Sequence, residues 1–443
     1  MKFLKSFYIH NTFFRYIAVL AASFVLSYWF PVIYPISWLL TLLLFSLFLF
    51  DIYLLYWPHS AIMAKRVLPK KLSNSDYNPL RMIYRSSYNF KTYVSIIDEL
   101  PVQFQKRDFE HRSVLDKNED YQFEYNLRPV ERGEYHFGSL IVFASSPLKI
   151  IKRKYTFEKG RTVPVYPSII QMQQYDFLAI SNHLTEMGLK KMRRIGHTQE
   201  FEQIKEYVSG DDIRTVNWKA TAKLNNLMVN QYQDEKSQPV YSIIDTGRVM
   251  KMPFNDLKLL DYAINSTLAF SNVALKRHDK TGMITFSKSI ETHLPAVQKI
   301  THLNSILENL YGIDTSFTDS DFGLLYGHVK RKVSHRSLLL FYTNFEHISA
   351  LRRQLPYLLA LAKKHVLVVI FFENTELADL ITRDTEDIQD IYHKSVAEKF
   401  SFEKQLMQKE LQKYGIQTIL TKPENLTLKT INKYLEIKAR GLI

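Results

Sequence analysis

The chain has 443 residues, more than one ordinary domain holds, and 46% of them are hydrophobic, so it can bury more than one core. The absence of cysteine excludes disulfides, cysteine-ligated zinc sites and thiol nucleophiles. The net charge of +14 indicates that the protein lies near or binds an anionic surface or molecule. Because the basic residues occur in short scattered groups without interleaved aromatic side chains, we expect a membrane bilayer and no nucleic acid.

Residues 1–61 are predicted to form a transmembrane hairpin. No charged residue occurs from Ile17 to Phe50, and this run is too long for one helix across a hydrocarbon core about 30 Å thick. Pro31 and Pro35 interrupt the middle of the run, where one helix should end and a second should begin. We therefore expect two transmembrane helices.

Basic residues flank the apolar block on both sides and are absent from its turn. By the positive-inside rule, we expect a multi-pass protein of the inner (plasma) membrane with both termini and the soluble domains in the cytoplasm. Asp51 lies near the end of the second helix, where we expect its carboxylate to be solvated at the membrane interface rather than to form a proton or ion site.

Residues 62–168 change to short alternating runs separated by glycine and proline. Strands are predicted at Tyr93–Ile97, Tyr121–Tyr125 and Leu140–Phe143, and no helical period of any length appears. This pattern is typical of a small antiparallel β-sandwich.

Residues 169–443 alternate buried apolar runs with amphipathic helices, which predicts an α/β domain with an open parallel sheet covered by helices on both faces. The carboxyl ends of such strands usually carry the site. No glycine-rich phosphate loop and no nucleophile elbow follows a strand, so we expect no enzyme. The predicted strands are 240–244, 283–286, 338–342, 366–372 and 416–420, and the residues at their ends are Asp245, Ser287, Thr343, Asn344, Glu373 and Asn374.

The most distinctive stretch runs from Glu200 to Ala222, and its part from Gly210 to Ala222 is either structural or a partner surface. Asp212 is a candidate cap for a helix beginning at Ile213, on which Arg214 and Trp218 would lie four residues apart and close together. Two interpretations remain open. A buried polar clasp that fixes the stretch against the sheet is the one we expect, and a recognition surface for a partner is the alternative.

The surrounding residues form a longer pattern that resembles the domain of unknown function 58 (DUF58) family, bacterial von Willebrand factor A-like membrane proteins. The likeness implies a von Willebrand factor A-like (Rossmann-like) sheet. It also implies partnership with a MoxR-type AAA+ ATPase and other von Willebrand factor A-domain proteins in envelope or complex assembly. The residues that carry it are Glu206, Tyr207, Gly210, Asp211, Asp212, Arg214, Asn217, Trp218, Lys219 and Ala222.

Many proteins of that fold bind a divalent metal through a D-x-S-x-S loop, and the resemblance implies where such a loop would lie. Here the loop reads Asp245, Thr246, Gly247, Arg248, Val249, so both of its serines are lost and Arg248 brings a positive charge to the place of the cation. A later strand ends in Thr343 and Asn344 instead of an aspartate. One remaining acid is too few for Mg²⁺, so we expect no metal and no cofactor.

Three functions remain for the chain. The first, which we expect, is a membrane-anchored, non-enzymatic interaction scaffold that works as an adaptor for an AAA+ ATPase. The second is a metal-dependent ligand-binding module, and the third is a hydrolase of unknown substrate.

Overall fold

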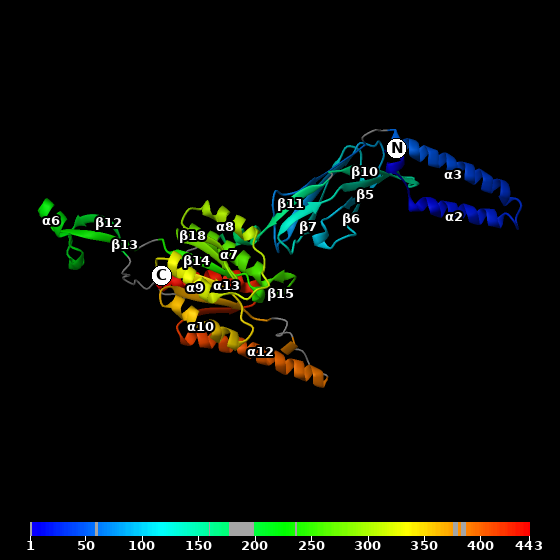
Figure 1. The fold of residues 1–443 in the computed structure, drawn as a ribbon. Coiled ribbons are helices and arrows are strands. Elements are labelled where there is room, and N and C mark those ends of the chain that lie inside the picture. Colours follow the sequence, from blue (N-terminus) through cyan, green and yellow to red (C-terminus); the bar gives the residue numbers. More distant parts are fainter. Residues whose placement is uncertain are drawn as a thin grey trace. The chain divides into compact units, whose positions relative to one another are not determined.

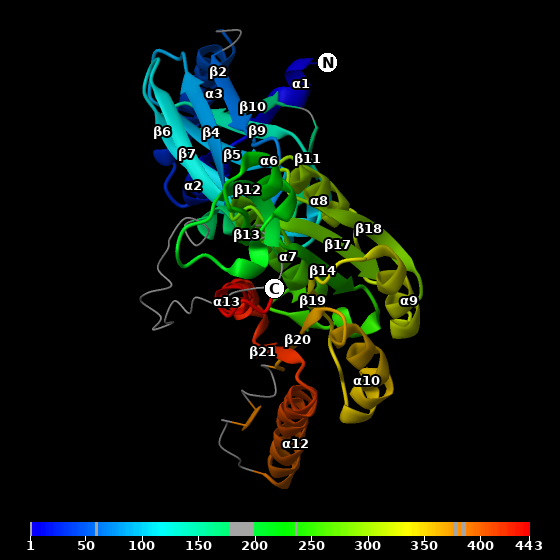
Figure 2. The ribbon, with the colours of Figure 1, turned by 90° about the vertical axis from the view of Figure 1, so that its left-hand side faces the viewer.

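The computed structural model describes residues 2–57, 61–158, 160–176, 199–234, 237–374, 380–381 and 387–443. The chain divides into two compact units, Met1–Tyr166 and Pro167–Ile443. Each unit is described separately below, and their elements can be followed by label in Figures 1 and 2.

The first unit begins with two apolar helices, α2 (Asn11–Leu26) and α3 (Ile33–Tyr56), which run antiparallel to one another (Figure 1). The Ser23 hydroxyl donates to the Ser37 hydroxyl at 3.0 Å, and the rings of Phe24 and Trp38 meet edge to face. At 1.5 Å per residue, the 24 residues of α3 extend for about 36 Å and the 16 residues of α2 for about 24 Å. Within the described residues, α3 is the helix long and apolar enough to cross a membrane, and α2 is apolar but shorter.

The expectation that the Asp51 carboxylate is solvated is wrong. The residue is fully buried and accepts hydrogen bonds from the Ser146 hydroxyl and from the backbone N–H groups of Ile150 (3.2 Å) and Ile151 (3.0 Å). One turn later, the Leu55 carbonyl accepts from the Tyr88 hydroxyl at 2.7 Å. The end of α3 is therefore bonded into the β-strands that follow it in the chain.

The strands of the first unit form three sheets with the orders β1-β10-β9-β5-β6, β2-β4-β7 and β3-β11-β8. Every pairing except that of β11 with β3 is antiparallel, as predicted for this segment. Alternate residues of β4, β5 and β9 face a shared core, as the two-residue period of a strand requires. The elements are α1 (Lys2–Ser6), β1 (Phe7–Ile9), β2 (Ile62–Val67), β3 (Leu72–Ser73), β4 (Asn78–Ser86), β5 (Thr92–Asp98), η1 (Val102–Phe104), β6 (Glu110–Leu115), β7 (Asp120–Leu127), β8 (Gly133–Phe137), β9 (Leu140–Ser145), β10 (Ile151–Phe157) and β11 (Arg161–Tyr166).

The second unit is built on a six-stranded sheet with the order β18-β17-β14-β19-β20-β21. The five strands other than β18 are parallel, and they correspond to the five predicted runs. The antiparallel edge strand β18 is not among the predicted strands. The strands are β14 (Pro239–Asp245), β17 (Lys280–Phe286), β18 (Ile290–Val297), β19 (Leu338–Tyr342), β20 (Val366–Phe372) and β21 (Gln417–Thr421).

Helices cover both faces of this sheet, as predicted, because successive residues of each buried strand point to opposite sides. On one face, Ile244 and Tyr342 pack with residues of α7, α8 and α13. On the other face, Ile243 and Phe341 pack with residues of α9, α10 and α12. The helices are α4 (Ile169–Gln174), α7 (Leu259–Lys276), α8 (His302–Tyr311), α9 (Phe322–Lys332), α10 (Ile348–Ala362), α12 (Ile388–Lys413) and α13 (Leu426–Ala439), with short elements η4 (Arg248–Met250), β15 (Pro253–Phe254), β16 (Leu257–Lys258) and η5 (Pro423–Asn425).

Candidate functional site

The parallel strands of the second unit bring several predicted residues to one edge of the sheet. Asp245 ends β14, Thr343 and Asn344 follow β19, and Glu373 and Asn374 follow β20. Because β14, β19 and β20 are adjacent and parallel, their carboxyl ends meet at this edge. The edge carries two distinct features, a hydrogen-bonded network around Asp245 and a neighbouring cavity.

The Asp245 carboxylate is buried and accepts three hydrogen bonds. Its Oδ1 atom accepts from the Gly247 N–H at 2.8 Å and from the Ser320 hydroxyl, and its Oδ2 atom accepts from the Thr343 hydroxyl at 2.6 Å. Burial raises the pKa of Asp245, although these hydrogen bonds oppose the shift. Asp245 and Thr343, which the sequence predicted at one edge of the sheet, are therefore hydrogen-bonded to one another. Ser320, which the sequence did not point to, is the third member of the network.

Position 247 has no room for a side chain larger than that of glycine. A Cβ atom added at this position would lie 2.2 Å from the Ser320 hydroxyl oxygen and 3.0 Å from Asp245 Oδ1. The Ser320 hydroxyl, from a distant loop, therefore takes the space beside the carboxylate. Arg248 does not stand in the place of a cation as expected, because its side chain is 57% exposed and lies 3.8 Å from the Asp319 carboxylate.

A second carboxylate lies beyond the first. Glu291 Oε1 accepts from the Thr246 hydroxyl at 2.8 Å and from the Ser287 hydroxyl at 2.7 Å. Mg²⁺ requires oxygen lone pairs that point toward one centre in octahedral array. Here the hydroxyl hydrogens of both groups are directed at carboxylate oxygens instead. The donor set fits a closed hydrogen-bonded network better than a divalent-cation site.

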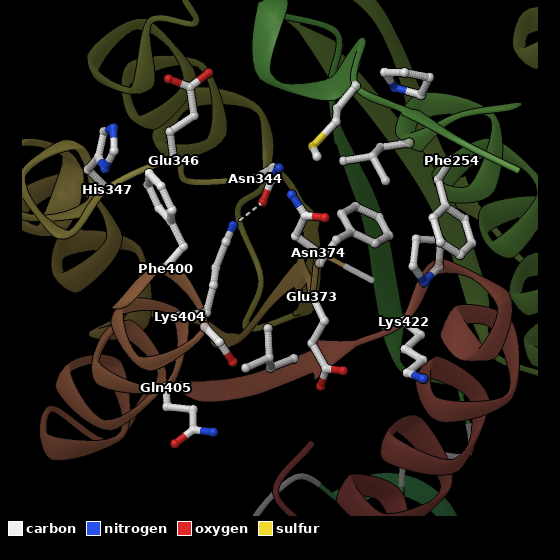
Figure 3. Close-up of a pocket in the computed structure, with 17 residues that line it drawn as sticks. Phe254, Asn344, Glu346, His347, Glu373, Asn374, Phe400, Lys404, Gln405 and Lys422 are labelled. Carbon is white, nitrogen blue, oxygen red and sulfur yellow. Dashed lines mark hydrogen bonds between the residues drawn. The ribbon is translucent and has the colours of Figure 1, made fainter. Parts of the chain in front are cut away.

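The cavity beside this network has a volume of about 530 Å³ and lies where β19, β20 and β21 end against α12 (Figure 3). Lys404 of α12 is the group that sequence reasoning missed. Its Nζ atom donates to Asn344 Oδ1 at 2.7 Å and to the Phe345 carbonyl at 2.6 Å. Burial lowers the pKa of Lys404 to about 8, and the nearby Glu346 carboxylate acts in the opposite direction. No sequence signal marks this lysine, since its partners lie about 60 residues earlier in the chain.

The distinctive stretch forms part of a separate antiparallel pair, β12 (Gln199–Glu206) and β13 (Met228–Asp234), with η3 (Ile213–Thr215) and α6 (Trp218–Leu224) between the strands. We call residues 199–234 the signature hairpin. Its polar residues shape the connection: the Asp212 side chain accepts from the Arg214 N–H at 3.0 Å, and the Asn217 side chain caps α6 by accepting from the Ala220 N–H at 3.0 Å. Gly210 has φ of +113°, a conformation that favours glycine.

The other polar residues of the pattern pair locally within the same hairpin. Asp211 accepts from Lys205 Nζ and from the Val208 N–H, both at 3.0 Å. Glu206 accepts from the Asn226 side chain at 3.0 Å. The Tyr207 N–H donates to the Leu227 carbonyl at 2.8 Å. The Asp211 contacts fold the loop after β12 back on itself, and the Glu206 and Tyr207 contacts connect the two sides of the hairpin.

The preferred interpretation of this stretch as a buried clasp is wrong. Trp218 and Ile213 are each 71% exposed, and Arg214, Lys219 and Ala222 are also exposed. The single helix expected from Ile213 is in fact two elements, because Asn217 ends the extended link after η3 and begins α6. Arg214 and Trp218 consequently lie on different elements.

Comparison with known proteins adds the family. Residues 203–388 match the family model described as "Protein of unknown function DUF58". This part of the chain is similar to the DUF58 family. The match begins within the signature hairpin and includes the Asp245 network and most of the sheet. The predicted DUF58 likeness is therefore confirmed.

The uncharacterized protein YeaD of Bacillus subtilis (strain 168) is 28% identical to the chain over 123 residues, which are 27% of this chain and 30% of YeaD. The chain thus matches less than a third of that relative's length. The conserved hypothetical protein BatB from Bacteroides thetaiotaomicron has 17% identity and a TM-score of 0.32, covering 46% of this chain and 100% of BatB. Proximal thread matrix protein 1 from the mussel byssus has 10% identity and a TM-score of 0.27, covering 46% of each chain.

Proposed function

We propose that this DUF58 protein is a membrane-anchored, non-enzymatic interaction protein that presents its signature hairpin to a protein partner. The observation that carries the proposal is the exposure of Trp218, the largest apolar side chain of the hairpin, on the surface of α6. Buried tryptophans are the side chains that most often dominate binding energy in protein interfaces. A tryptophan left exposed within the segment that matches the family model supports a docking role.

Other apolar side chains of the hairpin support the same role. Val208 is 62% exposed, Ile213 71% and Leu224 57%, and all belong to the segment between β12 and β13 that also carries Trp218. Exposed apolar groups that recur within one small segment are typical of interaction surfaces. The basic side chains Lys219 and Lys223 of α6 add positive charge beside the tryptophan.

The anchor is the pair of apolar helices α2 and α3. The length and apolarity of α3 support one crossing. We propose that α2 makes the second crossing, so that the protein is multi-pass in the inner membrane with both termini cytoplasmic. The basic residues on both sides of the pair support this orientation.

The family likeness supplies the proposed partner. It implies a MoxR-type AAA+ ATPase, together with other von Willebrand factor A-domain proteins, in envelope or complex assembly. It also implies that the six-stranded sheet is von Willebrand factor A-like. In this proposal the protein is an adaptor that holds the ATPase at the membrane, and the Asp245 network holds the sheet edge together without a metal.

Co-purification from detergent-solubilised membranes tests the proposal. Trp218→Ala should melt like the wild type, because an exposed side chain contributes little to folding. The variant should retain at least about tenfold less partner, since an interface hot spot contributes 2 kcal/mol or more. Tyr392→Ala is the matched control, because Tyr392 is 68% exposed on α12, outside the hairpin. Equal partner recovery from the wild type and Trp218→Ala would contradict the proposal.

A further inference from the structure

The cavity at the sheet edge has the size and position of a ligand site. Its volume of about 530 Å³ lies within the range of roughly 300–1,000 Å³ that small-molecule pockets occupy. Its walls come from the ends of three parallel strands and from α12, which is the place where open α/β sheets bind ligands. The Asp245 network does not line it, so the two features are separate.

The polar wall of the cavity carries the Lys404 ammonium, whose hydrogen bonds to described residues both go to uncharged groups. An ammonium has three N–H donors, and the two hydrogen bonds of Lys404 go to neutral oxygens, those of Asn344 and Phe345. Among the described residues, no carboxylate forms an ion pair with Lys404 within 4.0 Å. Removing a charged group from water costs free energy unless an opposite charge lies beside it, so the Lys404 ammonium favours binding of an anion in the cavity.

The remainder of the lining is largely apolar. Phe254, Phe372, Leu420 and Pro423 line the cavity, and Figure 3 shows Phe254 on the side away from Lys404. A ligand that reaches from the ammonium to this wall must therefore combine one charged end with an apolar body.

The other charged groups around the cavity limit the charge of the ligand. Glu346, Glu373, Lys422 and His347 also line it, and His347 lies 3.5 Å from Glu403. Lys422 is exposed to water, which weakens its attraction for an anion. The carboxylates of Glu346 and Glu373 beside the half-buried Lys404 ammonium would repel a dianion such as a phosphate. One negative charge fits this balance, and a carboxylate supplies it.

We propose that this cavity binds a monocarboxylate with an apolar or aromatic body, with the carboxylate on Lys404 and the body against Phe254, Phe372 and Leu420. Two sources share this chemistry, a free small molecule and the C-terminal residue of a polypeptide. The site is independent of the signature hairpin, so its test does not depend on the proposed adaptor role.

Fluorine NMR tests the proposal on the full chain in phosphatidylcholine nanodiscs, with empty nanodiscs as the blank. The probe is N-acetyl-4-fluoro-L-phenylalanine, and the control ligand is its primary amide, which has the same body without the charge. We expect saturable binding of the acid and at least about tenfold weaker binding of the amide, as the loss of a charge-assisted contact predicts. Failure of the acid to saturate below about 10 mM, a dissociation constant equivalent to less than 3 kcal/mol, would overturn the proposal.

Matched variants locate the carboxylate. Lys404→Met keeps the length of the side chain and removes its charge, so it should weaken binding of the acid by at least about tenfold. Lys409→Met makes the same substitution at an exposed position of the same helix, outside the cavity lining, and should bind like the wild type. Wild-type binding by Lys404→Met would overturn the proposal.

A pH titration of the wild type provides a measurement that does not depend on how the variant folds. Because the pKa of Lys404 is lowered to about 8, the ammonium is lost above that pH. Affinity for the acid should be level near pH 7 and fall about tenfold for each unit above pH 8, while affinity for the amide stays constant. Equal pH profiles for acid and amide would overturn the proposal.

A tripeptide distinguishes the two sources. Ala-Ala-(4-fluoro-phenylalanine) with a free C-terminus should bind about as well as the acid if the natural ligand is a small molecule. It should bind at least about tenfold more tightly if the cavity receives a chain terminus, because the added residues then contribute contacts. Either result supports the carboxylate site, and loss of binding on amidation of the tripeptide is expected in both cases.

Discussion

Replacement of Asp51 by alanine should separate the end of α3 from the β-strands of the first unit. The substitution leaves three buried donors without their acceptor: the Ser146 hydroxyl and the N–H groups of Ile150 and Ile151. An orphaned buried donor costs about 1–3 kcal/mol, so the loss for the three donors should be about 3–9 kcal/mol. That loss is a large part of the 5–15 kcal/mol that stabilises an ordinary domain.

Hydrogen exchange, followed by mass spectrometry on the protein in nanodiscs, measures this loss of local stability directly. The amides of Ile150 and Ile151 should exchange more than about a hundredfold faster in Asp51→Ala, since 3 kcal/mol of local stability corresponds to that factor. Thr41→Ala is the control on the same helix, because its hydroxyl donates to the Ser37 carbonyl within α3. Unchanged exchange of both amides in Asp51→Ala would refute the account of Asp51 as the link between helix and strands.

Three further predictions concern the membrane, the metal and the pH. Reporter fusions after residue 60 and at Ile443 should both give cytoplasmic signals, and an extracytoplasmic signal from either would disprove the hairpin topology. Calorimetric titration should show no saturable micromolar binding of Mg²⁺ or Mn²⁺, and binding that disappears in Asp245→Ala would reverse this conclusion. Burial lowers the pKa of His365 from 6.5 to about 4. Between these two pH values the imidazole is protonated in the unfolded chain and neutral in the folded chain, so a falling pH favours unfolding. The free energy of unfolding should therefore fall by about 3 kcal/mol between pH 6.5 and 4, and a denaturation series in which His365→Leu loses as much as the wild type would be inconsistent with this cause.

The sheet of the second unit was predictable from sequence because its strands are buried on both faces. Val366–Phe372 is a continuous apolar run, and the helices beside it have their own period, so local patterns identify both. The edge strand Ile290–Val297 was missed because it is only partly buried and lacks such a run. Its pairing with β17 depends on the tertiary structure rather than on a local signal.

The hydrogen bonds that were not predicted join distant parts of the chain. Asp51 and Ser146 are 95 residues apart, and Ser320 and Asp245 are 75 apart, so neither pair has a local pattern. The error at Trp218 has a different cause. The prediction of one helix from Ile213 onward did not take account of Asn217, whose side chain caps a new helix. Trp218 is the first residue of that helix, and its side chain is exposed.

Photocrosslinking in living cells tests the adaptor role most directly. A photoreactive p-benzoyl-phenylalanine at position 218 replaces one exposed aromatic side chain by another and captures what lies beside it. The account predicts an adduct at this position that contains an AAA+ ATPase, and no such adduct from the same residue placed at position 392 of α12. Absence of an adduct at position 218, or the same adducts at both positions, would contradict the account.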